Sequence, residues 1–446
     1  MTKCIYVSGA GYVGLVSAAC YAQKATVSLY EKDQAKRENI ALARAPFFEP
    51  GLNQLLTKAL ETGCLQIVTD PTAAVAASDL SFVAVGTPLR RDGFINISQV
   101  LAACRDIGRG LRRSSRYHVV TIRSTVFPGT TSGLVLRTLE RASGKKAGED
   151  FGLVACPEFL REGSAVHDTL HPSRIVVGSI DDRSGDMIED FVREFHVDLP
   201  PLLRVTPETA EIIKYASNGF LATKVAFINE MSNLCERFQG VDVKQVADGM
   251  GYDPRIGRAF LDAGLGFGGA CLPKDLRALA EGAKRIGLRL RIPEATLASN
   301  ESQPLRVIDM ARELIGTLNR KRAAVLGLSF KPGTSDMREA SSVRIVRALL
   351  DSGMHVSVYD PVAMGNARRF FGRRVNYAKS VRDCLDDADC CFIVTEWDEF
   401  KAIPPDLFLE TMEKPVVIDG RRVIDPLKLD PKIAYRAIGL GRSRRN

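Results

Sequence analysis

Cys4-Ile-Tyr-Val-Ser-Gly-Ala-Gly-Tyr-Val-Gly14 is the stretch that decides the fold of this chain. Its first five residues form a short, mostly apolar run typical of a buried strand, and the small residues after Gly14 predict a helix. The glycines between them, spaced G-x-G-x-x-G, permit a tight turn and let a pyrophosphate approach the helix N-terminus. A strand, a glycine turn and a helix in this order predict a dinucleotide-binding α/β unit.

The next predicted strand, Thr26–Tyr30, ends in Glu31, which lies twenty residues after Gly11. A carboxylate at this position can hold the diol of a ribose, which favours NAD over NADP. We therefore expect NAD as the cofactor. The residues expected to bind it in this region are Gly9, Gly11, Tyr12, Val13, Gly14, Glu31 and Lys36.

The alternation of strands and helices continues along the chain. The strand Asp79–Val85 ends in Gly86-Thr-Pro88, and the strand His118–Ile122 ends in Ser124-Thr125. Ligands of open parallel sheets sit at the carboxyl ends of strands, so both loops are placed to meet the cofactor or the substrate. Ordinary turn chemistry is the alternative for either loop taken alone. The residues expected to contact the cofactor here are Gly86, Thr87, Pro88 and Thr125.

Two acids follow the next predicted strand. Leu153–Pro157 leads into Glu158-Phe-Leu-Arg-Glu162, and if this segment is helical the two carboxylates share one face. Two acids at the carboxyl end of a strand can transfer protons or position a water molecule. The alternative is a solvated helix start, where acids are common because the helix dipole favours them.

Thr206-Pro-Glu208 predicts the start of a long helix, with an N-cap, a proline and an acid in the first turn. The pattern runs to Phe238, which corresponds to a rod of about 48 Å. We expect this helix to bridge two domains and to offer a face for self-association. Lys214 and Asn218 lie one turn apart on it, and the apolar residues around Lys214 indicate a buried functional lysine.

A glycine-rich loop, Gly264-Leu-Gly-Phe-Gly-Gly-Ala-Cys271, precedes Lys274 and Asp275. Its nearly bare backbone can lie directly against a ligand. A thiol at the mouth of this loop is uncrowded, and the nearby Lys274 ammonium would favour the nucleophilic thiolate. The pattern indicates covalent catalysis on an electrophilic carbon, whereas the alternative for a lone cysteine is a buried structural role.

A second α/β unit begins at Arg322–Leu328 and contains a predicted helix at 339–352 and further predicted strands at His355–Tyr359, Cys390–Thr395 and Pro415–Ile418. The expected fold class is α/β, with two Rossmann-like doubly wound domains joined by a long central helix and a helical dimerisation domain. We expect the NAD-binding domain at residues 1–200, the central helical domain with the cysteine loop at 201–300, and the second Rossmann-like domain at 301–446.

Composition narrows the class of protein. The chain has 446 residues, of which 45% are hydrophobic and 26% charged, as in a soluble globular protein. The net charge of +8 suits an anionic small molecule, and no nucleic-acid-binding signature is present. Ten cysteines without framework spacing indicate free thiols in a reducing compartment. Without a signal peptide or a membrane-spanning run, we expect a cytoplasmic protein with no nucleic-acid partner, no membrane partner and no metal site.

The sequence resembles a known family in a series of motifs that cover the whole chain. They are, in order, Gly11-Tyr-Val-Gly14, Gly86-Thr-Pro88, Ser124-Thr125, Pro157-Glu-Phe-Leu-Arg-Glu162, Lys214 with Asn218, Gly268-Gly-Ala-Cys-Leu-Pro-Lys-Asp275 and Phe330-Lys331. Together these motifs resemble the UDP-glucose/GDP-mannose dehydrogenase family. The resemblance implies oxidation of the C6 alcohol of a nucleotide sugar to a carboxylate, with reduction of two NAD⁺ and no release of the aldehyde. It also implies that residues 301–446 bind the nucleotide and that the protein is a homodimer or a larger homo-oligomer.

The resemblance implies a role for each catalytic candidate. Cys271 would attack the aldehyde to give a thiohemiacetal, which loses a second hydride and becomes a thioester. Lys214, helped by Asn218, would stabilise the developing oxyanions. Asp275 would orient or activate the water that hydrolyses the thioester. The full catalytic set is Cys271, Lys214, Asn218, Asp275, Glu158, Glu162 and Thr125.

The resemblance also extends the binding sets. Glu162, Lys274 and Arg338 join the cofactor-binding residues. Arg255 resembles an arginine that reaches into the active site of the partner subunit, which would make the dimer necessary for activity. The residues expected to contact the substrate are Glu158, Phe159, Leu160, Glu162, Lys214, Asn218, Arg255, Phe260, Gly264, Gly266, Phe267, Gly268, Lys331 and Arg421.

The choice of sugar rests on the motifs nearest the C-terminus. Arg255-Ile-Gly, Val394–Phe400 and Asp419-Gly-Arg421 resemble UDP-glucose dehydrogenases, whereas Ser143–Gly148 and Cys271-Leu-Pro resemble GDP-mannose dehydrogenases. Because the C-terminal motifs are expected to line the nucleotide, we expect UDP-glucose. GDP-mannose and a UDP-N-acetyl sugar are the alternatives.

Two other functions remain open. A one-step NAD-dependent alcohol or hydroxyacid dehydrogenase would use Lys214 and Asn218 and leave Cys271 structural. A non-catalytic nucleotide-sugar-binding protein could share the scaffold, although the presence of Cys271, Lys214 and Asp275 together argues against it. The departures from the family pattern, which are Glu31 for an aspartate, Ala270 for a serine and Leu272 for a phenylalanine, remove no catalytic group.

Overall fold

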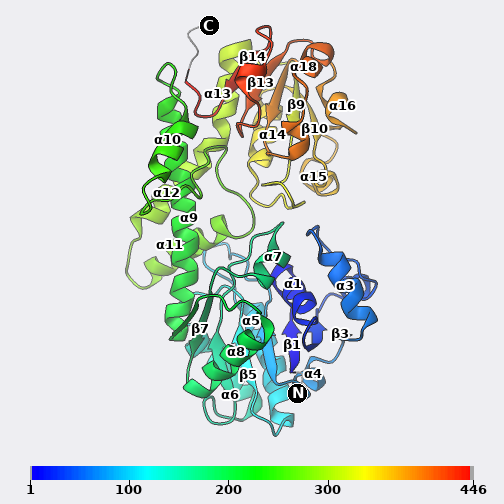
Figure 1. The fold of residues 1–446 in the computed structure, drawn as a ribbon, viewed down its shortest axis with the longest axis vertical. Helices are drawn as coiled ribbons and strands as arrows, with labels where there is room; N and C mark the ends of the chain where they lie inside the picture. Colours follow the sequence, from blue (N-terminus) through cyan, green and yellow to red (C-terminus); the bar gives the residue numbers. More distant parts are fainter. Residues whose placement is uncertain (1–2, 442–446) are drawn as a thin grey trace. The chain divides into compact units, whose positions relative to one another are not determined.

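The computed structural model describes residues 3–441 (Figure 1). The chain forms two compact units, residues 1–217 and residues 218–446. The division falls within α9 (Pro207–Cys235), so this helix contributes residues to both units. The expected α/β class, with two Rossmann-like sheets and a long helix between them in the sequence, is confirmed.

The N-terminal unit is built on an eight-stranded sheet in the order β3-β2-β1-β4-β5-β6-β7-β8. Neighbouring strands are parallel except β6 and β7, which pair antiparallel. The chain order reverses between β1 and β4, and in doubly wound folds ligands bind at the carboxyl ends of the strands at this point. The strands are β1 (Cys4–Ser8), β2 (Thr26–Tyr30), β3 (Leu65–Val68), β4 (Leu80–Val83), β5 (Val119–Ile122), β6 (Gly152–Ala155), β7 (Ile175–Ser179) and β8 (Leu202–Val205).

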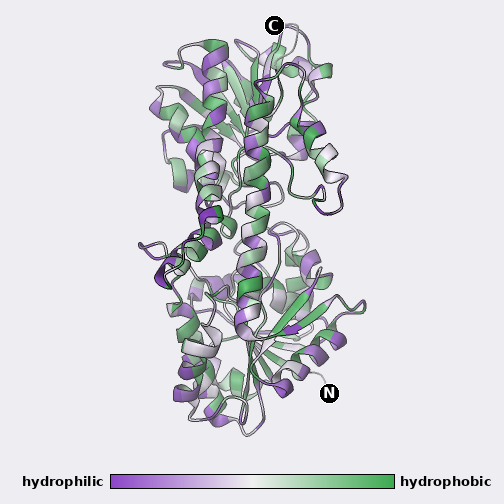
Figure 2. Ribbon diagram, turned by 90° about the vertical axis from the view of Figure 1, so that its left-hand side faces the viewer, coloured by the Kyte–Doolittle hydropathy of each residue, from purple (hydrophilic) through white to green (hydrophobic). Residues whose placement is uncertain are grey.

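Helices cover both faces of this sheet, because successive strand side chains point to opposite sides. Ile5 and Val7 of β1 belong to one apolar cluster and Tyr6 to another. Figure 2 shows strands that are mainly hydrophobic and helices with one hydrophilic side. The helices are α1 (Tyr12–Tyr21), α2 (Gln34–Ala41), α3 (Leu52–Glu61), α4 (Pro71–Ala76), α5 (Ser98–Arg113), the π-helix η1 (Thr131–Val135), α6 (Leu136–Ser143), α7 (Ala165–Leu170) and α8 (Asp182–Phe195).

The C-terminal unit contains a six-stranded sheet in the order β11-β10-β9-β12-β13-β14, with every neighbouring pair parallel. The same alternation divides its strands between two cores: Ala323 and Val325 of β9 pack on one side, Ala324 and Leu326 on the other. The strands are β9 (Arg322–Leu326), β10 (His355–Tyr359), β11 (Asn376–Tyr377), β12 (Cys390–Ile393), β13 (Val416–Asp419) and β14 (Ala434–Ala437).

Helices make up the first part of the C-terminal unit and also flank its sheet. They are α10 (Val243–Gly251), α11 (Leu272–Arg285), α12 (Arg291–Ser302), η2 (Gln303–Leu305), α13 (Arg306–Ile315), α14 (Ser341–Asp351), α15 (Met364–Phe371), α16 (Val381–Leu385), α17 (Asp398–Lys401), α18 (Pro405–Thr411) and η3 (Pro426–Lys428). Within residues 3–441, no helix combines the length and the apolar character that crossing a bilayer requires.

Two helix boundaries differ from the sequence-based expectation. Helix α9 ends at Cys235 rather than Phe238, because the chain turns there toward Gly240, whose φ is +75°. Helix α14 begins at Ser341 rather than residue 339, because Glu339 has a φ of +51°, outside the range of a right-handed helix.

Candidate active site

The glycine turn after β1 has the geometry that the sequence predicts. Gly9 has a φ of +99°, and a Cβ there would lie 2.8 Å from the Ala84 carbonyl oxygen after β4. A Cβ at Gly14 would lie 1.9 Å from the Gly9 carbonyl oxygen, so only glycine lets α1 pack this closely on the turn. Open space surrounds the Cβ position of Gly11. The turn therefore fits a pyrophosphate approaching the N-terminus of α1.

Glu31, at the end of β2, is buried and fixed by two backbone amides. Its carboxylate accepts the Ala10 N–H at 3.0 Å and the Asp33 N–H at 3.1 Å. A carboxylate has about four acceptor positions, so Glu31 retains capacity for the hydroxyl groups of a ribose. The glycine turn and Glu31 together fit NAD. Lys36, in the first turn of α2, is exposed, and its contact with the cofactor stays a prediction.

A loop that the sequence analysis overlooked links this turn to the acid-bearing segment. The Tyr12 ring stacks on Phe47 with centroids 3.9 Å apart, and the Tyr12 hydroxyl donates to the Phe48 carbonyl at 2.8 Å. The buried carboxylate of the next residue, Glu49, accepts the N–H groups of residues 163 and 165, each at 2.7 Å. The signal was present in the sequence as an acid between two phenylalanines and a proline, Phe47-Phe-Glu-Pro50.

A buried ion pair lies at the carboxyl end of β6. The Lys214 ammonium of α9 donates to the Glu158 main-chain oxygen at 2.7 Å and to its carboxylate at 3.0 Å. The two side chains are 5% and 8% exposed. The Lys214 nitrogen also lies 5.4 Å from the centroid of the Phe159 ring. The expectation of a buried lysine at this position is confirmed.

The charge state of Glu158 follows from its partners. Burial alone would raise the pKa of its carboxyl, but the Lys214 ammonium and the Leu160 N–H, which donates at 2.7 Å, outweigh it and lower the pKa. Glu158 is therefore ionised at neutral pH. An ionised carboxylate beside Lys214 can accept a proton or hold the lysine in place.

The expectation that Glu158 and Glu162 share a helix face is wrong. Residues 158–161 have no regular secondary structure, a turn follows at 162–163, and α7 begins only at Ala165. The Glu158 carbonyl, which a helix would use for the N–H of residue 162, accepts the Lys214 ammonium instead. Glu162 is partly buried. It directly precedes residue 163, whose N–H donates to the Glu49 carboxylate.

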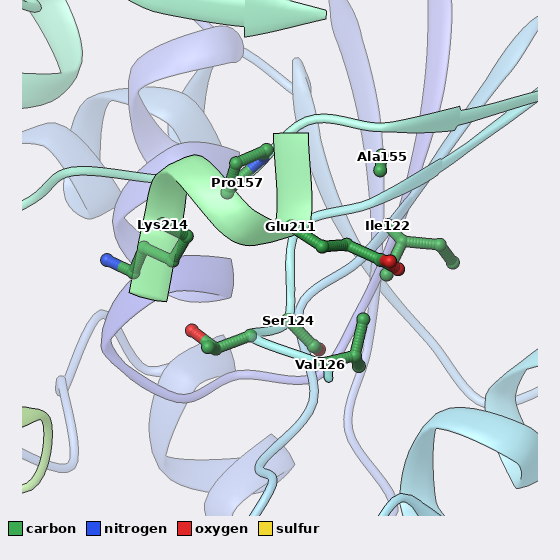
Figure 3. A pocket seen from close by; sticks show the side chains of 8 residues that line it. Ile122, Ser124, Val126, Ala155, Pro157, Glu211 and Lys214 are labelled. Atoms are coloured by element: carbon green, nitrogen blue, oxygen red, sulfur yellow. The ribbon is translucent and has the colours of Figure 1, made fainter. Parts of the chain in front are cut away.

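A pocket in the N-terminal unit connects the Lys214 region with the loop after β5 (Figure 3). Its lining residues come from the ends of β5 and β6 and from the first turns of α9: Ile122, Ser124, Thr125, Val126, Ala155, Pro157, Glu211 and Lys214. The Ser124 hydroxyl donates to the Val85 carbonyl at 2.7 Å, which fixes this loop to the one that carries Gly86, Thr87 and Pro88. Thr125 thus lines the same pocket as Lys214, as its predicted role near the hydride transfer requires.

A second cluster of candidate residues lies in the C-terminal unit. Asp275 is 1% exposed and accepts the Asn218 side-chain N–H at 2.7 Å. The Lys274 ammonium donates to its other carboxylate oxygen at 2.5 Å. Asn218, Lys274 and Asp275 are therefore brought together, and the amide of Asn218 is fixed by a carboxylate.

Cys271 is exposed, whereas the other nine cysteines are buried or partly buried. The alternative of a buried structural cysteine is therefore wrong for this position. Cys271 is the N-cap residue of α11. The positive end of a helix dipole favours a thiolate, so the N-terminus of α11 adds to the stabilisation expected from Lys274, which stays a prediction.

The glycine loop before Cys271 is held in one conformation. A Cβ at Gly268 would lie 2.6 Å from the Glu339 carbonyl oxygen. The Asn300 side-chain amide bonds both main-chain groups of Phe267, at 2.7 and 2.9 Å, and Gly264 donates to the Asn229 side chain at 2.8 Å. Gly266 has a φ of +84°. The loop can therefore present its backbone to a ligand without reorganising.

Two predicted substrate contacts lie on the segment between α10 and α11. Arg255 is 88% exposed at its side chain and pairs with Asp253 at 2.6 Å. Phe260 has a φ of +64° and is partly exposed. Both residues stay predictions as substrate contacts.

The remaining predicted contacts follow strands of the C-terminal sheet. Arg421, after β13, donates to the Val394 carbonyl at 2.8 Å. Lys331 lies in the loop after β9, and Arg338, in the same loop, pairs with Asp336 at 2.6 Å. Strand ends are where this fold binds ligands, which fits Lys331 and Arg421 as substrate contacts.

Comparison with known proteins places these features in one class, the NAD-dependent oxidoreductases. Three domain profiles of the UDP-glucose/GDP-mannose dehydrogenase family match the chain: the NAD binding domain at residues 3–196, the central domain at 208–302 and the UDP binding domain at 324–426. The chain belongs to the UDP-glucose/GDP-mannose dehydrogenase family.

Individual relatives match over nearly their whole length. The UDP-glucose 6-dehydrogenase of Bacillus subtilis is 41% identical over 94% of this chain and 89% of its own. The UDP-glucose 6-dehydrogenase of Rhizobium meliloti is 40% identical over 98% of this chain and 99% of its own. A UDP-glucose dehydrogenase structure from Pyrobaculum islandicum superposes with a TM-score of 0.91 at 40% identity, covering 99% of this chain and 98% of that one.

Proposed function

We propose that this protein oxidises the C6 hydroxyl group of UDP-glucose to a carboxylate and reduces two NAD⁺ for each sugar. The observation that carries the proposal is the exposed Cys271 at the N-terminus of α11. It lies four residues before Asp275, whose carboxylate bonds Asn218. An exposed thiol with a stabilised thiolate is what a double oxidation through a covalent intermediate needs. The UDP-glucose 6-dehydrogenases that this chain resembles support the choice of substrate.

NAD, held by the glycine turn after β1 and by Glu31, would supply the acceptor for the hydride that leaves C6 in each of the two oxidations. In the first oxidation, the hydroxyl group loses its proton and C6 becomes an aldehyde. The Lys214 ammonium, held by the ionised Glu158, stabilises the negative charge that develops on the C6 oxygen. Thr125 and Glu162 are assigned to positioning around the same step.

Cys271 then makes the second oxidation possible. Its thiolate forms a carbon–sulfur bond to C6, and the resulting thiohemiacetal can lose a hydride, which the aldehyde itself releases poorly. The product is a thioester between Cys271 and the sugar. The aldehyde remains bound to the protein throughout, so it is not released.

Hydrolysis of the thioester completes the reaction. The buried carboxylate of Asp275, fixed by Asn218 and Lys274, is assigned to orient a water molecule toward C6. Attack by this water breaks the carbon–sulfur bond and restores the Cys271 thiolate. Each sugar consumes one water molecule and gives up two hydrides and three protons, so charge and hydrogen balance against two NAD⁺.

We further propose a homodimer. Phe220, Phe227 and Leu234 recur every seven residues on α9 and are 67%, 46% and 53% exposed. A stripe with this spacing stays on one face of a helix, and exposed apolar stripes on long helices serve association. The exposed Arg255 is assigned to the partner subunit's active site.

We also propose that the protein works in the cytoplasm. Its ten cysteines form no disulfide bond within the described residues. Cys390 and Cys391 are fully buried on β12, where they act as small apolar core residues. This use of cysteine suits a reducing compartment.

The test is NADH production with UDP-glucose, GDP-mannose and UDP-N-acetylglucosamine in parallel. The proposal predicts the highest kcat/KM with UDP-glucose and two NADH for each sugar consumed. One NADH per sugar would instead support the one-step dehydrogenase, and highest activity with GDP-mannose would transfer the assignment to that substrate. Binding of the sugars without any NADH would support the non-catalytic alternative.

A further inference from the structure

Glu211 is a buried acid that the reaction as proposed does not use. It lies one turn before Lys214 on α9, is 4% exposed, and lines the same pocket as Lys214 and Thr125. Figure 3 shows its carboxylate directed toward Ile122, whereas the Lys214 amine points away from it. A buried carboxylate needs donors, and the donors of Glu211 show which segment it holds.

Both oxygens of Glu211 accept backbone N–H groups from the segment that follows Thr125. One bond comes from Gly129 at 2.6 Å and the other from Thr131 at 2.9 Å. Thr131 begins the π-helix η1, whose first N–H groups have no partner within the helix. The carboxylate therefore fixes the backbone of residues 129–131 to the helix that carries Lys214.

Two weaker contacts support the same attachment. Glu208, one turn earlier on α9, accepts the Ser132 hydroxyl. The Phe127 ring packs edge-on against Tyr215 of α9, with centroids 6.3 Å apart. Neither contact fixes a backbone N–H group, so among these contacts from α9 it is Glu211 that holds the main chain of residues 129–131.

We propose that Glu211 is a positioning residue that holds the Thr125 loop against the helix carrying Lys214. The inference rests on the proposed function, in which Thr125 and Lys214 act on the same C6 group. Misplacing a reacting group by about 1 Å can cost roughly 100-fold in rate, so a fixed distance between the two elements matters for kcat.

The ionisation of Glu211 gives the attachment a pH dependence. Burial raises the pKa of Glu211 to about 7, although the donors on Thr131 and Gly129 favour the charged form. The neighbouring ionisable groups are Glu208 and Lys214, both on α9. The strand ends and the loop contribute Ile122, Ala155, Gly129 and Thr131, none of which titrates. Below pH 7 the carboxyl takes up a proton, accepts the two N–H groups less well, and holds the loop less firmly.

The test compares Glu211→Gln with Glu208→Gln, a matched change one turn away on the same helix. At pH 8 we expect Glu211→Gln to lower kcat about tenfold or more and to change the KM for NAD by less than about threefold. Glu208→Gln should stay within about threefold of the wild type in both, because the amide oxygen of glutamine can still accept the Ser132 hydroxyl. The wild-type kcat should fall below pH 7, and this acid limb should be absent in Glu211→Gln. An unchanged kcat and an unchanged pH profile in Glu211→Gln would overturn the proposal.

Hydrogen exchange on the wild-type protein tests the same inference without a variant. After correction for intrinsic rates, residues 127–132 should lose protection between pH 8 and pH 6, while the β5 amides should not. Equal protection of residues 127–132 at both pH values contradicts the proposal. Because exchange needs no substrate, this result stands even if the wild type proves inactive with every nucleotide sugar, an outcome that would contradict only the proposed function.

Discussion

Lys214 shows how a single buried side chain serves both structure and chemistry. Its ammonium bonds the main chain and the carboxylate of Glu158, and both side chains are almost fully buried. A buried pair of this kind adds little net stability, but removing one partner leaves an uncompensated charge. The pair thus keeps a cation in a pocket where the proposed reaction develops negative charge.

Replacing Lys214 by methionine should therefore damage both properties. We expect a loss of about 3 kcal/mol in the free energy of unfolding, because the Glu158 carboxylate stays buried without its cation. We expect kcat to fall by about 100-fold or more, because the oxyanion loses its stabilising charge. Urea unfolding and steady-state kinetics measure the two effects. Lys58→Met, on the exposed side of α3, is the surface control, and equal behaviour of the two variants would contradict the role of Lys214.

The sequence predicted the candidate residues whose signal is local and missed those whose partners are distant. Cys271 follows a glycine loop, and Lys214 interrupts an apolar helix pattern, so both could be recognised. Glu49 and Glu211 act on backbone N–H groups about 80 to 115 residues away along the chain. Backbone donors leave no mark in the sequence, so the partners of these two acids can be identified only in the folded chain.

At the level of single elements, β4 and β5 are joined by a buried histidine. The His118 ring on the residue before β5 bonds Ser81 at 2.7 Å through Nε2 and the Ser78 carbonyl at 2.9 Å through Nδ1. The carbonyl requires a donor at Nδ1, so Nε2 accepts from the Ser81 hydroxyl and the ring is neutral. Burial lowers the pKa of His118 to about 4. It outweighs the hydrogen bond to the Ser78 carbonyl, which favours the charged ring and raises the pKa.

His118 should make the stability of the N-terminal unit depend on pH. Its pKa is lower in the folded chain than in the unfolded chain, so between pH 6.5 and 4 only the unfolded chain binds the proton. The stability it confers is present above pH 6.5 and is lost as the pH falls toward 4, by about 2 kcal/mol at pH 5. The measurement is the urea midpoint of the wild type and of His118→Gln, each at pH 7 and at pH 5. The wild-type midpoint should exceed that of the variant by more at pH 7 than at pH 5. An equal difference at both pH values would show that the ring does not titrate as described.

Whether a segment forms a helix or a strand was predictable where the hydrophobic period was clear. It was less predictable where polar side chains form hydrogen bonds with the main chain. The strands and α9 follow their apolar patterns closely. The segment from Glu158 to Glu162 does not, and Glu158 is bonded instead at its carbonyl and its carboxylate by Lys214, which is 56 residues away. Local propensity carries no information about such a distant donor.

The same turn occurs in both units of the molecule, after β1 and after β9. Gly9 after β1 donates to the Tyr30 carbonyl, and Gly327 after β9 donates to the Tyr359 carbonyl, both at 2.8 Å. The acids that follow, Glu31 and Asp360, each accept the N–H of the residue after that glycine. The recurrence of a sheet order and a turn explains why two Rossmann-like units could be predicted from the alternation of strands and helices.

The two turns differ in what they leave available. Asp360 accepts donors from Leu328, Ser329, Val362, Ala363 and Trp397, so its oxygens are used within the protein. Within the described residues, Glu31 accepts two backbone N–H groups, so its carboxylate keeps acceptor positions for a ribose. The acid in the C-terminal unit is structural, which suits a unit that binds a different nucleotide. The domain boundaries at residues 200 and 300 stay predictions.

The proposed dimer leads to a test with two inactive variants. If Arg255 acts in the partner subunit's active site, mixing Arg255→Ala chains with Cys271→Ser chains should restore activity. A random equimolar mixture should regain about a quarter of the wild-type activity. Half of its dimers are mixed, and one of the two sites in each mixed dimer has both residues intact. Kinetics after co-refolding, with each variant refolded alone as the control, measure this. Activity that stays at the level of the separate variants would contradict a shared site.

The covalent step is tested most directly by the mass of the peptide that contains Cys271. Wild-type protein is mixed with UDP-glucose and NAD⁺, quenched in acid during turnover and digested, with Cys271→Ser as the matched control. We expect the wild-type peptide to carry the mass of the nucleotide sugar acid as a thioester, and the control peptide to carry none. Two NADH per sugar from a wild-type protein that never carries this mass would contradict catalysis through Cys271.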